Sequence, residues 1–397
     1  MTVQVSELDG VLRPIGQAVG LPNAAYTDAD FAVAESKAVF QDGWAAIGFG
    51  KDVPGPGDAV PVDFQGMPLL LLRDRKGTVR VFQNVCRHRG MILVDKPTRI
   101  KGVIRCPYHA WCYGMDGALR TTPDVGGPGI NDHADVDKDG LGLIEVRSTV
   151  WMDVVFVNMS GTAPDFAVAN APLAARWREF DHPIYHGGPE SSFSLELKAN
   201  WKLAVENYCE SYHLPAVHPG LNTYSRLEDH YHLEEPGHFS GQGTLVYNPS
   251  PDTSGRCFTN FPGLSSKWDK AAEYASLYPN VLLGVHRDHT FAILLIPTGT
   301  DRVVERVELY YADPAMTEAP YEDLRRRNAE MWRAVFLEDV FVVEGMQRGR
   351  AAPGFDGGHF SPVMDGPTHL FHRWVAARMG GTESTPTDVR EGIERVA

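Results

Sequence analysis

The sequence has few cysteines and no long apolar run, and each shortage excludes a class of protein. Its five cysteines are an odd, widely spaced set in 397 residues, which does not suit a disulfide framework. Its longest apolar runs, Pro68–Leu72 and Phe291–Pro297, are far shorter than the roughly 20 residues of a membrane span. The first ten residues hold no basic segment followed by an apolar run, so we expect no signal peptide and a cytoplasmic location.

Positive charge is also scarce. The chain has 37 Lys and Arg residues against 51 Asp and Glu residues, a formal net charge of −14. Such a chain repels nucleic acid and acidic membrane surfaces, so we expect neither as a partner. The apolar fraction of 43% and the charged fraction of 22% are those of a globular protein, and the length indicates more than one hydrophobic core.

The pattern of residues divides the chain into three segments. Residues 1–41 are expected to form an N-terminal helical segment that packs on the third segment. Residues 42–160 are typical of a small all-β domain, with short strands between Gly/Pro turns at Leu69–Leu72, Val79–Asn84, Val103–Cys106, Leu143–Val146 and Val154–Asn158. Residues 161–397 indicate an α+β domain with strands at Ser192–Lys198, Val281–Ile296 and Val303–Ala312, and helices at Trp201–Tyr212, Tyr321–Arg348 and Thr368–Met379.

Two short Cys–His pairs lie in the expected β domain. Cys86 and His88 form a C-x-H pair, and after seventeen intervening residues Cys106 and His109 form a C-x-x-H pair. Two thiolates and two imidazoles suit either a tetrahedral zinc ion or a [2Fe–2S] cluster with both imidazoles on one iron. Zinc fingers usually pair Cys with Cys and His with His, so the mixed pairs favour the cluster.

These loops carry a resemblance to a known family. The stretches CRHRG and CPYHAW, followed by Tyr113 and Gly117, resemble the Rieske domain of ring-hydroxylating oxygenases. The resemblance implies that a [2Fe–2S] cluster is held by Cys86, His88, Cys106 and His109. Gly90 suits a backbone that runs close to such a cluster.

A second group of ligand-type residues lies in the expected α+β domain. His213 is expected in the last turn of a helix that Pro215 ends, and His218 follows five residues later. Two imidazoles at a helix end can bind one metal ion, and an oxygenase iron also needs a carboxylate. Asp339 is the candidate, because it recurs at helical spacing with an apolar stripe on the expected helix Tyr321–Arg348. Its neighbour Glu338 is off this stripe, so we expect it to be exposed.

The segment Asn200–His218 extends the resemblance. It is similar to the family motif N-W-K…E-N-x-x-x-(D/E)-x-Y-H-x-x-x-x-H, which implies that the mononuclear iron ligands are His213, His218 and Asp339. Asn207 matches a residue near the iron. Glu210 stands where most members carry Asp, the residue that bridges a Rieske histidine of one subunit to an iron-ligand histidine of its neighbour. A similar Glu occurs in carnitine monooxygenase-like members.

The resemblance implies a terminal oxygenase component with a Rieske domain and a helix-grip-like catalytic domain. It implies a homotrimer or larger ring that receives electrons originating from NAD(P)H through a separate reductase, with or without a ferredoxin. With O₂ it would hydroxylate a small organic substrate, an aromatic compound or its substituent, by mono- or dioxygenation. One alternative is hydroxylation or oxidative N-demethylation of a quaternary or N-methylated amine such as a betaine. Alternatives of other classes are a non-catalytic Rieske electron carrier and a zinc-stabilised binding protein.

The substrate pocket is expected to be lined by the sheet and by residues Leu221–Leu264. This stretch is rich in rings that stack on an aromatic substrate or surround a quaternary ammonium group, namely Tyr224, Tyr231, His232, Phe239, Tyr247, Phe258 and Phe261. Arg287 is either a partner for a substrate carboxylate or an ordinary surface arginine.

Overall fold

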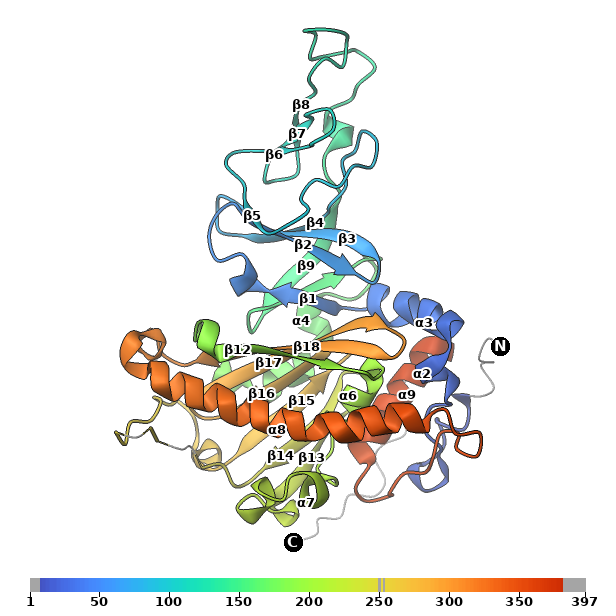
Figure 1. The fold of residues 1–397 in the computed structure, drawn as a ribbon, viewed down its shortest axis with the longest axis vertical. Helices are drawn as coiled ribbons and strands as arrows, with labels where there is room; N and C mark the ends of the chain where they lie inside the picture. Colours follow the sequence, from blue (N-terminus) through green and yellow to red (C-terminus); the bar gives the residue numbers. More distant parts are fainter. Residues whose placement is uncertain (1–7, 249–250, 253, 381–397) are drawn as a thin grey trace. The chain divides into compact units, whose positions relative to one another are not determined.

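The computed structural model describes residues 8–248, 251–252 and 254–380 (Figure 1). The chain forms two compact units, which we call the β unit (residues 41–163) and the α+β unit (residues 1–40 and 164–397). Residues 1–7 and 381–397, which belong to the first and third expected segments, lie outside the described residues. The division into three segments at residues 41 and 160 stays a prediction.

The β unit contains two antiparallel sheets. The larger has the strand order β1-β10-β9-β4-β3-β2-β5 and the smaller has the order β6-β7-β8. The strands are β1 (Ala45–Phe49), β2 (Asp58–Phe64), β3 (Met67–Arg73), β4 (Val79–Gln83), β5 (Thr98–Arg99), β6 (Ile104–Arg105), β7 (Cys112–Tyr113), β8 (Leu119–Thr121), β9 (Glu145–Trp151) and β10 (Val154–Asn158).

Tight turns and one apolar run explain how this sheet forms. Leu69 to Leu72 on β3 are all 0% exposed, as expected for a strand with both faces covered. The β2–β3 hairpin turns at Gln65 and Gly66, both with positive φ. The β9–β10 hairpin turns in the same way at Met152 and Asp153. Such two-residue turns match the twist of the paired strands, and they fix the register of both hairpins.

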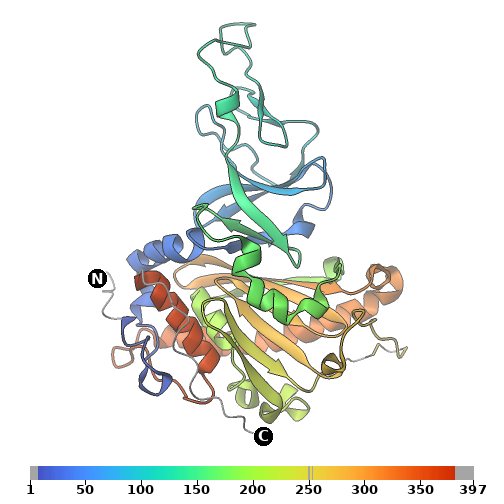
Figure 2. The same cartoon turned by 180° about the vertical axis from the view of Figure 1, so that it is seen from behind.

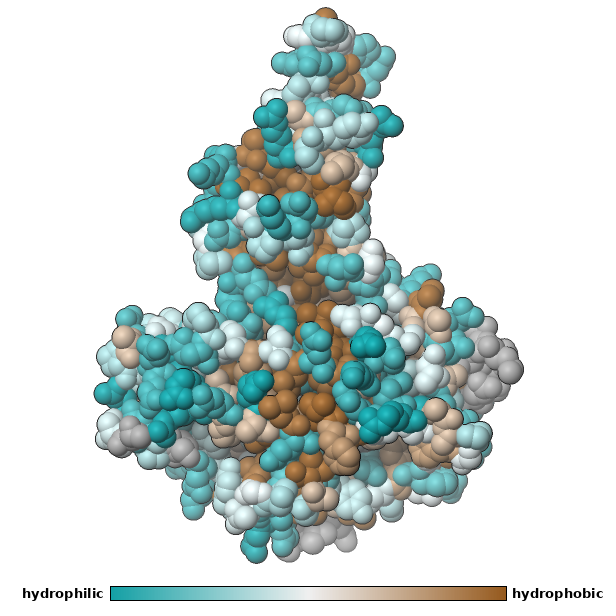
Figure 3. All heavy atoms as spheres, viewed as in Figure 1, coloured by the Kyte–Doolittle hydropathy of each residue, from teal (hydrophilic) through white to brown (hydrophobic). Residues whose placement is uncertain are grey.

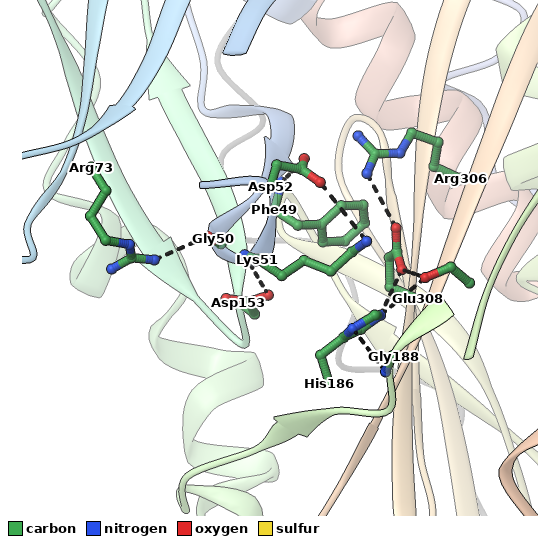
Figure 4. A network of polar contacts seen from close by, with 11 residues as sticks. Phe49, Gly50, Lys51, Asp52, Arg73, Asp153, His186, Gly188, Arg306 and Glu308 are labelled. Atoms are coloured by element: carbon green, nitrogen blue, oxygen red, sulfur yellow. Dashed lines mark hydrogen bonds and ion pairs between the residues drawn. The ribbon is translucent and has the colours of Figure 1, made fainter. Parts of the chain in front are cut away.

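Polar contacts hold the short segment after β1 in place (Figure 4). The Arg73 guanidinium donates through Nη2 to the Gly50 carbonyl oxygen at 3.0 Å. The Asp153 carboxylate accepts from the Lys51 backbone N–H at 3.2 Å. These bonds satisfy backbone groups that have no sheet partner, so this segment is fixed without being a strand.

One antiparallel sheet of eight strands forms the centre of the α+β unit. Its order is β11-β18-β17-β16-β15-β14-β13, and β12 also pairs with β18. The strands are β11 (Tyr185–His186), β12 (Ser192–Leu197), β13 (His230–Glu235), β14 (Phe239–Thr244), β15 (Ala272–Leu277), β16 (Val281–Val285), β17 (His289–Gly299) and β18 (Arg302–Tyr311).

Helices lie on both faces of this sheet. In Figure 1, α6, α8 and α9 lie across one face, and Figure 2 shows the short α4 and α5 on the opposite face. The helices of the unit are α2 (Ala24–Thr27), α3 (Ala29–Glu35), α4 (Phe166–Ala169), α5 (Ala171–Arg176), α6 (Trp201–Tyr208), α7 (Leu214–Val217), α8 (Glu322–Gly349) and α9 (Gly366–Gly380).

Three expected elements differ from the structure. The strand expected at Leu143–Val146 begins at Glu145 and continues to Trp151 as β9. The helix expected at Trp201–Tyr212 ends at Tyr208, and Pro215 lies in the first turn of the separate helix α7 instead of ending the first helix. Proline is well tolerated there because the first turn has no intrahelical N–H bond to lose. The single strand expected at Val281–Ile296 is a hairpin, since residues 286–288 form a turn between β16 and β17.

A buried ionic cluster ties the N-terminal helices to α6. The Lys202 side chain is 0% exposed, and its Nζ lies 2.7 Å from Glu35 Oε1. The Trp201 indole donates to the other oxygen of Glu35 at 2.9 Å. The Tyr26 hydroxyl donates to Glu206 Oε1 at 2.5 Å. A buried ammonium group is tolerated only with such partners, so residues 24–35 are an integral part of this unit.

A second polar cluster lies on β18 (Figure 4). The Glu308 carboxylate accepts from the Ser192 hydroxyl at 2.5 Å and lies 2.9 Å from His186 Nε2. Arg306 Nη2 lies 3.2 Å from the other oxygen of Glu308. Because Ser192 belongs to β12 and His186 to β11, this carboxylate links two of the three strands that pair with β18.

Glu305 on β18 is a buried acid that lacks a cationic partner among the described residues. Burial, followed by the negative charge of Asp339, raises the pKa of Glu305 to about 8. The folded chain therefore keeps this proton at neutral pH, whereas an unfolded chain releases it above about pH 4.3. Because the folded state binds more protons between these two values, Glu305 lowers stability as pH rises through that window.

We predict that Glu305→Gln becomes progressively more stable than the wild type between pH 5 and pH 8. The glutamine does not titrate, so the gain should approach about 1 kcal/mol per pH unit. Urea unfolding of both proteins at four pH values measures it. A stability difference that stays constant with pH would contradict the prediction.

Candidate metal centres

The two Cys–His loops of the β unit share one backbone conformation. The Cys86 carbonyl accepts from the Gly90 N–H at 3.0 Å, and the Cys106 carbonyl accepts from the Ala110 N–H at 3.1 Å. Both Gly90 and Ala110 have positive φ, 74° and 58°. No protein atom lies within 4 Å of a Cβ built on Gly90. The left-handed conformation, not a close approach to other protein atoms, therefore accounts for this glycine.

The side chains of the two loops converge. Cys86 and Cys106 are each 2% exposed, and the rings of His88 and His109 lie 4.6 Å apart between centroids. His88 also stacks on Trp111, at 4.8 Å and 10° from parallel. The buried Nδ1 of His109 has no hydrogen-bond partner, which is costly for a polar atom. A metal ion on that nitrogen would remove this cost, so the donor set fits an iron–sulfur cluster with imidazole ligands.

The spacing of the four ligand atoms in these loops is compatible with a cluster of two irons. A single tetrahedral zinc ion requires all four ligand atoms close together. Within the described part of the chain, one group of at least three possible ligands has its atoms within 4.8 Å of one another, and it is His213, His218 and Asp339. The four residues of the β unit do not meet that criterion, which agrees with ligands divided between two irons.

Tyr113, which the sequence analysis noted only as part of a motif, contacts the cluster loops directly. Its hydroxyl accepts from the Arg87 N–H at 3.0 Å and lies 3.2 Å from Cys86 Sγ. Because its lone pair is used by Arg87, the hydroxyl proton is free to point at the sulfur. Burial, followed by the bond to Cys86, raises the pKa of Tyr113 well above its usual value, so it remains a donor.

Glu210 lies in the loop between α6 and α7 and positions His213. Its Oε1 lies 2.6 Å from His213 Nδ1. Its Oε2 accepts from the backbone N–H groups of Tyr212 and His213. Since a carboxylate only accepts, Nδ1 carries the proton, and Nε2 of His213 is left as the ligand nitrogen.

Glu338 positions the other histidine, His218, in the same way. Its Oε2 lies 2.7 Å from His218 Nδ1, although 49% of the Glu338 side chain is exposed. The exposure of Glu338 was expected from the helical pattern, but its contact with His218 was not. Both imidazoles are thus oriented by a carboxylate on Nδ1, an arrangement common around metal-binding histidines.

The two Nε2 atoms meet at Asp339. Asp339 Oδ1 lies 3.0 Å from His218 Nε2 and 3.6 Å from His213 Nε2. Asn207 Nδ2 donates to the same oxygen at 3.2 Å. Burial opposes a charge on His218, but hydrogen bonds and charges from Asp339 and Glu338 outweigh it and raise the pKa of His218. This set of two imidazoles and one carboxylate fits the ligand set of a non-haem iron with open positions.

The apolar face that the sequence predicted for α8 is shifted by about one residue from the face that the structure buries. The buried side chains are those of Leu324, Arg325, Ala329, Trp332, Phe336, Val343 and Gln347. Asp339 itself is 17% exposed and lies with Asn328, Met331 and Val335 on the wall of a pocket. The expectation that Asp339 lies within the buried stripe of this helix was therefore wrong, although the residue does lie beside both histidines.

This pocket of the α+β unit contains His213, His218 and Asp339 and is rich in aromatic rings. Of the expected aromatic residues, Tyr224, Tyr247 and Phe258 line it, whereas Tyr231, His232, Phe239 and Phe261 do not. Arg287 is also outside the lining, and it donates to the Asp269 carbonyl at 2.8 Å. Further rings come from Tyr208, Tyr274, Trp332 and Phe336.

Comparisons with known proteins agree with both centres. Residues 43–134 match the Rieske [2Fe-2S] domain family, and residues 187–381 match the catalytic domain family of the ring hydroxylating alpha subunit. The carnitine monooxygenase oxygenase subunit of Escherichia coli (strain K12) is 27% identical, covering 85% of this chain and 86% of that protein. The chloroplastic choline monooxygenase of Arabidopsis thaliana is also 27% identical, covering 93% and 84%.

Solved structures share the fold. The quaternary ammonium Rieske monooxygenase CntA in complex with L-carnitine has a TM-score of 0.74 at 23% identity, covering 94% of this chain and 98% of that chain. Naphthalene 1,2-dioxygenase from a Rhodococcus species, bound to indole, has a TM-score of 0.70 at 18% identity, covering 96% and 99%.

The two matched domains together define a Rieske [2Fe–2S] module followed by a ring-hydroxylating catalytic domain. The chain belongs to the Rieske non-haem iron oxygenases, as an oxygenase alpha subunit. It is therefore an oxidoreductase that carries a [2Fe–2S] cluster and a mononuclear iron. The expected fold class is confirmed, as is the likeness to carnitine monooxygenase-like members. Alpha subunits of this family act on small molecules with a reductase and form multimers.

No helix in residues 8–248, 251–252 and 254–380 is long and apolar enough to cross a membrane.

We predict that Tyr113→Phe lowers the reduction potential of the Rieske cluster, on the order of tens of millivolts, because a donor to Cys86 Sγ stabilises the extra electron. Redox titration followed by the visible spectrum measures it. Tyr108→Phe is the control, since Tyr108 is 57% exposed. An unchanged potential in Tyr113→Phe would show that the hydroxyl does not act on the cluster.

Proposed function

We propose that this chain is the terminal oxygenase of a multicomponent system that hydroxylates a small quaternary or N-methylated amine. The observation that carries the proposal is the meeting of His213, His218 and Asp339 in the wall of an aromatic pocket. In this proposal these three residues hold the mononuclear iron, while the [2Fe–2S] cluster is held by Cys86, His88, Cys106 and His109. Iron at such a site binds and activates O₂.

The residues of this chain orient the reaction. Glu210 and Glu338 fix the tautomers of the two histidines, so both ligand nitrogens face Asp339. Asn207 restrains Asp339 through its amide. In a monooxygenation, one oxygen atom enters a C–H bond of the substrate and the other leaves as water, with two electrons and two protons supplied from outside the pocket. The aromatic walls hold the substrate and limit the access of water.

Glu210 is the residue through which we expect electrons to reach His213. Its bond to His213 Nδ1 is half of the bridge that the family resemblance implies. The other half, His109 of a neighbouring subunit, requires a multimer, which we expect to be a trimer. Figure 3 shows an apolar area on the face where α8 lies in Figure 1. Leu337 and Phe341 on α8 are 43% and 76% exposed, and we expect a neighbouring subunit to cover side chains of this kind.

The amine substrate is favoured by the relatives and by the pocket. The relatives named above are monooxygenases of carnitine and of choline, and both compounds contain a quaternary ammonium group. Such a group cannot donate hydrogen bonds, so it is bound by aromatic faces and negative charge. The pocket supplies both, with seven aromatic rings and the carboxylate of Asp288.

The other expectations from the sequence stay predictions. These are an aromatic substrate, dioxygenation, a ferredoxin, and a cytoplasmic location. An electron carrier needs only the cluster module, so the second metal-ligand set and its pocket argue against a non-catalytic role.

Substrate-dependent O₂ uptake tests the proposal. We expect carnitine-like betaines, choline or their N-methylated analogues to give uptake coupled to hydroxylated product, and aromatic acids to give none. Asp339→Ala is the control, which should keep the red-brown cluster but lose mononuclear iron and nearly all turnover, a loss of at least about a thousandfold. Coupled turnover of an aromatic acid but of no amine, or full activity in Asp339→Ala, would refute the proposal.

We predict that Glu210→Gln reduces its cluster normally but delivers electrons to the iron site at least about tenfold more slowly, because the charged link to His213 is lost. Single-turnover oxidation of the pre-reduced protein measures this rate. Glu338→Gln is the matched variant, since it makes the same change beside His218 instead. It should lower iron occupancy while the rate per occupied site stays near the wild-type value. Equal rates for wild type and Glu210→Gln would contradict the bridge.

A further inference from the structure

Buried carboxylates in the α+β unit generally lie beside a cation. Glu273 is 0% exposed and contacts both Arg176 and Lys267 at 2.8 Å. Glu206 lies 3.2 Å from His372 Nε2 and 3.7 Å from Arg350. This is the usual requirement, because an uncompensated buried charge costs several kcal/mol.

Asp288 is an exception. It is 2% exposed and lies in the turn between β16 and β17 that replaces the expected continuous strand. Its Oδ1 is bonded by the Tyr247 hydroxyl at 2.9 Å and by His289 Nδ1 at 2.9 Å. In the described part of the chain no Lys or Arg nitrogen lies within 4.0 Å of this carboxylate, and Oδ2 accepts no hydrogen bond.

His289 does not supply the missing charge. The Trp332 indole N–H donates to His289 Nε2 at 2.9 Å, and an indole nitrogen can only donate. Nε2 is therefore unprotonated, and Nδ1 carries the single ring proton, which it donates to Asp288. The imidazole is neutral and would have to lose the Trp332 bond to become charged.

The two residues that precede Asp288 in the chain do not supply the missing positive charge either. Burial lowers the pKa of His286 well below its usual value, so His286 is neutral. The Arg287 guanidinium donates to the Asp269 carbonyl and forms no ion pair with Asp288, although its charge acts on Tyr247. Burial, followed by the negative charge of Asp288, raises the pKa of Tyr247, so its hydroxyl keeps the proton that it donates to Asp288.

The location of Asp288 identifies what would compensate it. Asp288 lines the same pocket as His213, His218 and Asp339. The rings of Tyr247, Tyr274 and Trp332 line it as well, so a cation beside Asp288 would also face aromatic π-systems. The bonds from Tyr247 and His289 hold the carboxylate, and Trp332 in turn fixes the His289 ring. Little ordering would therefore be needed when a ligand binds.

We propose that Asp288 is the counter-ion for a positively charged nitrogen of the substrate, and that it makes the pocket selective for cationic over neutral ligands of the same shape. This inference rests on the proposed amine function and assigns its recognition to one residue. A free carboxylate on an aromatic acid would be repelled at this position, which explains in physical terms why the pocket should prefer amines.

The test compares binding of cations with binding of their uncharged carbon isosteres. The probes are choline against 3,3-dimethylbutan-1-ol, and carnitine against the analogue in which carbon replaces the nitrogen. Calorimetry on the iron-loaded, anaerobic holoprotein gives each Kd. We expect the wild type to prefer the cation at least about tenfold. Asp288→Asn has nearly the same shape without the charge, and it should reduce that preference to within about threefold.

The control variant is Glu330→Gln, which removes one negative charge from the exposed face of α8, where Glu330 pairs with Arg326. It should keep the wild-type preference. A cation preference in Asp288→Asn equal to that of the wild type would overturn the role of Asp288 while leaving amine turnover intact. Failure of every cation to bind the wild type would overturn it too. Coupled turnover of aromatic acids alone would instead overturn the proposed function.

Discussion

The orientation of two imidazole rings is the constraint on which the catalytic unit depends. His213 and His218 each donate Nδ1–H to a carboxylate, from Glu210 and Glu338, and only then do both Nε2 atoms face Asp339. The break between α6 and α7 serves this geometry, because it frees Glu210 from a helix and lets it cap the turn that holds His213. In a continuous helix, the N–H groups of Tyr212 and His213 would instead be bonded to carbonyls of the preceding turn.

The α+β unit handles buried negative charge in several ways that differ in consequence. Glu273 is neutralised by permanent cations, and Glu305 keeps its proton at neutral pH. Asp339 lies beside two imidazoles, so a metal ion bound by all three side chains can replace the contacts between them. Asp288 has only neutral donors. The first two arrangements stabilise a fixed fold, whereas the last two leave charge available to something that enters the pocket.

The sequence predicted the ligand residues better than their surroundings. Mixed Cys–His spacing and the segment Asn200–His218 indicated which ligand-type side chains the structure brings together, because ligand chemistry depends on residue type. The helical spacing of apolar residues indicated Asp339, although the residues that are buried on α8 lie about one position away. It did so because the residues that line the pocket are next to the buried residues on this helix. Glu338 was missed because exposure was taken to mean no role. Asp288 was missed because a polar turn within an apolar run resembles a continuous strand.

The two ends of the β unit are hydrogen-bonded to each other, and this affects how the unit could be exchanged during evolution. Asn158 Nδ2 donates to the carbonyls of Gln41 and Gly43, and the Ser160 N–H donates to Gln41. The chain therefore enters and leaves the β unit at neighbouring, hydrogen-bonded positions. The β unit is an insertion between residues 40 and 164 of the α+β unit. Domain insertions whose ends already lie together add little loop-closure entropy. Recombination could thus exchange the redox module as a cassette, joined at two neighbouring positions, without altering the pocket that selects the substrate.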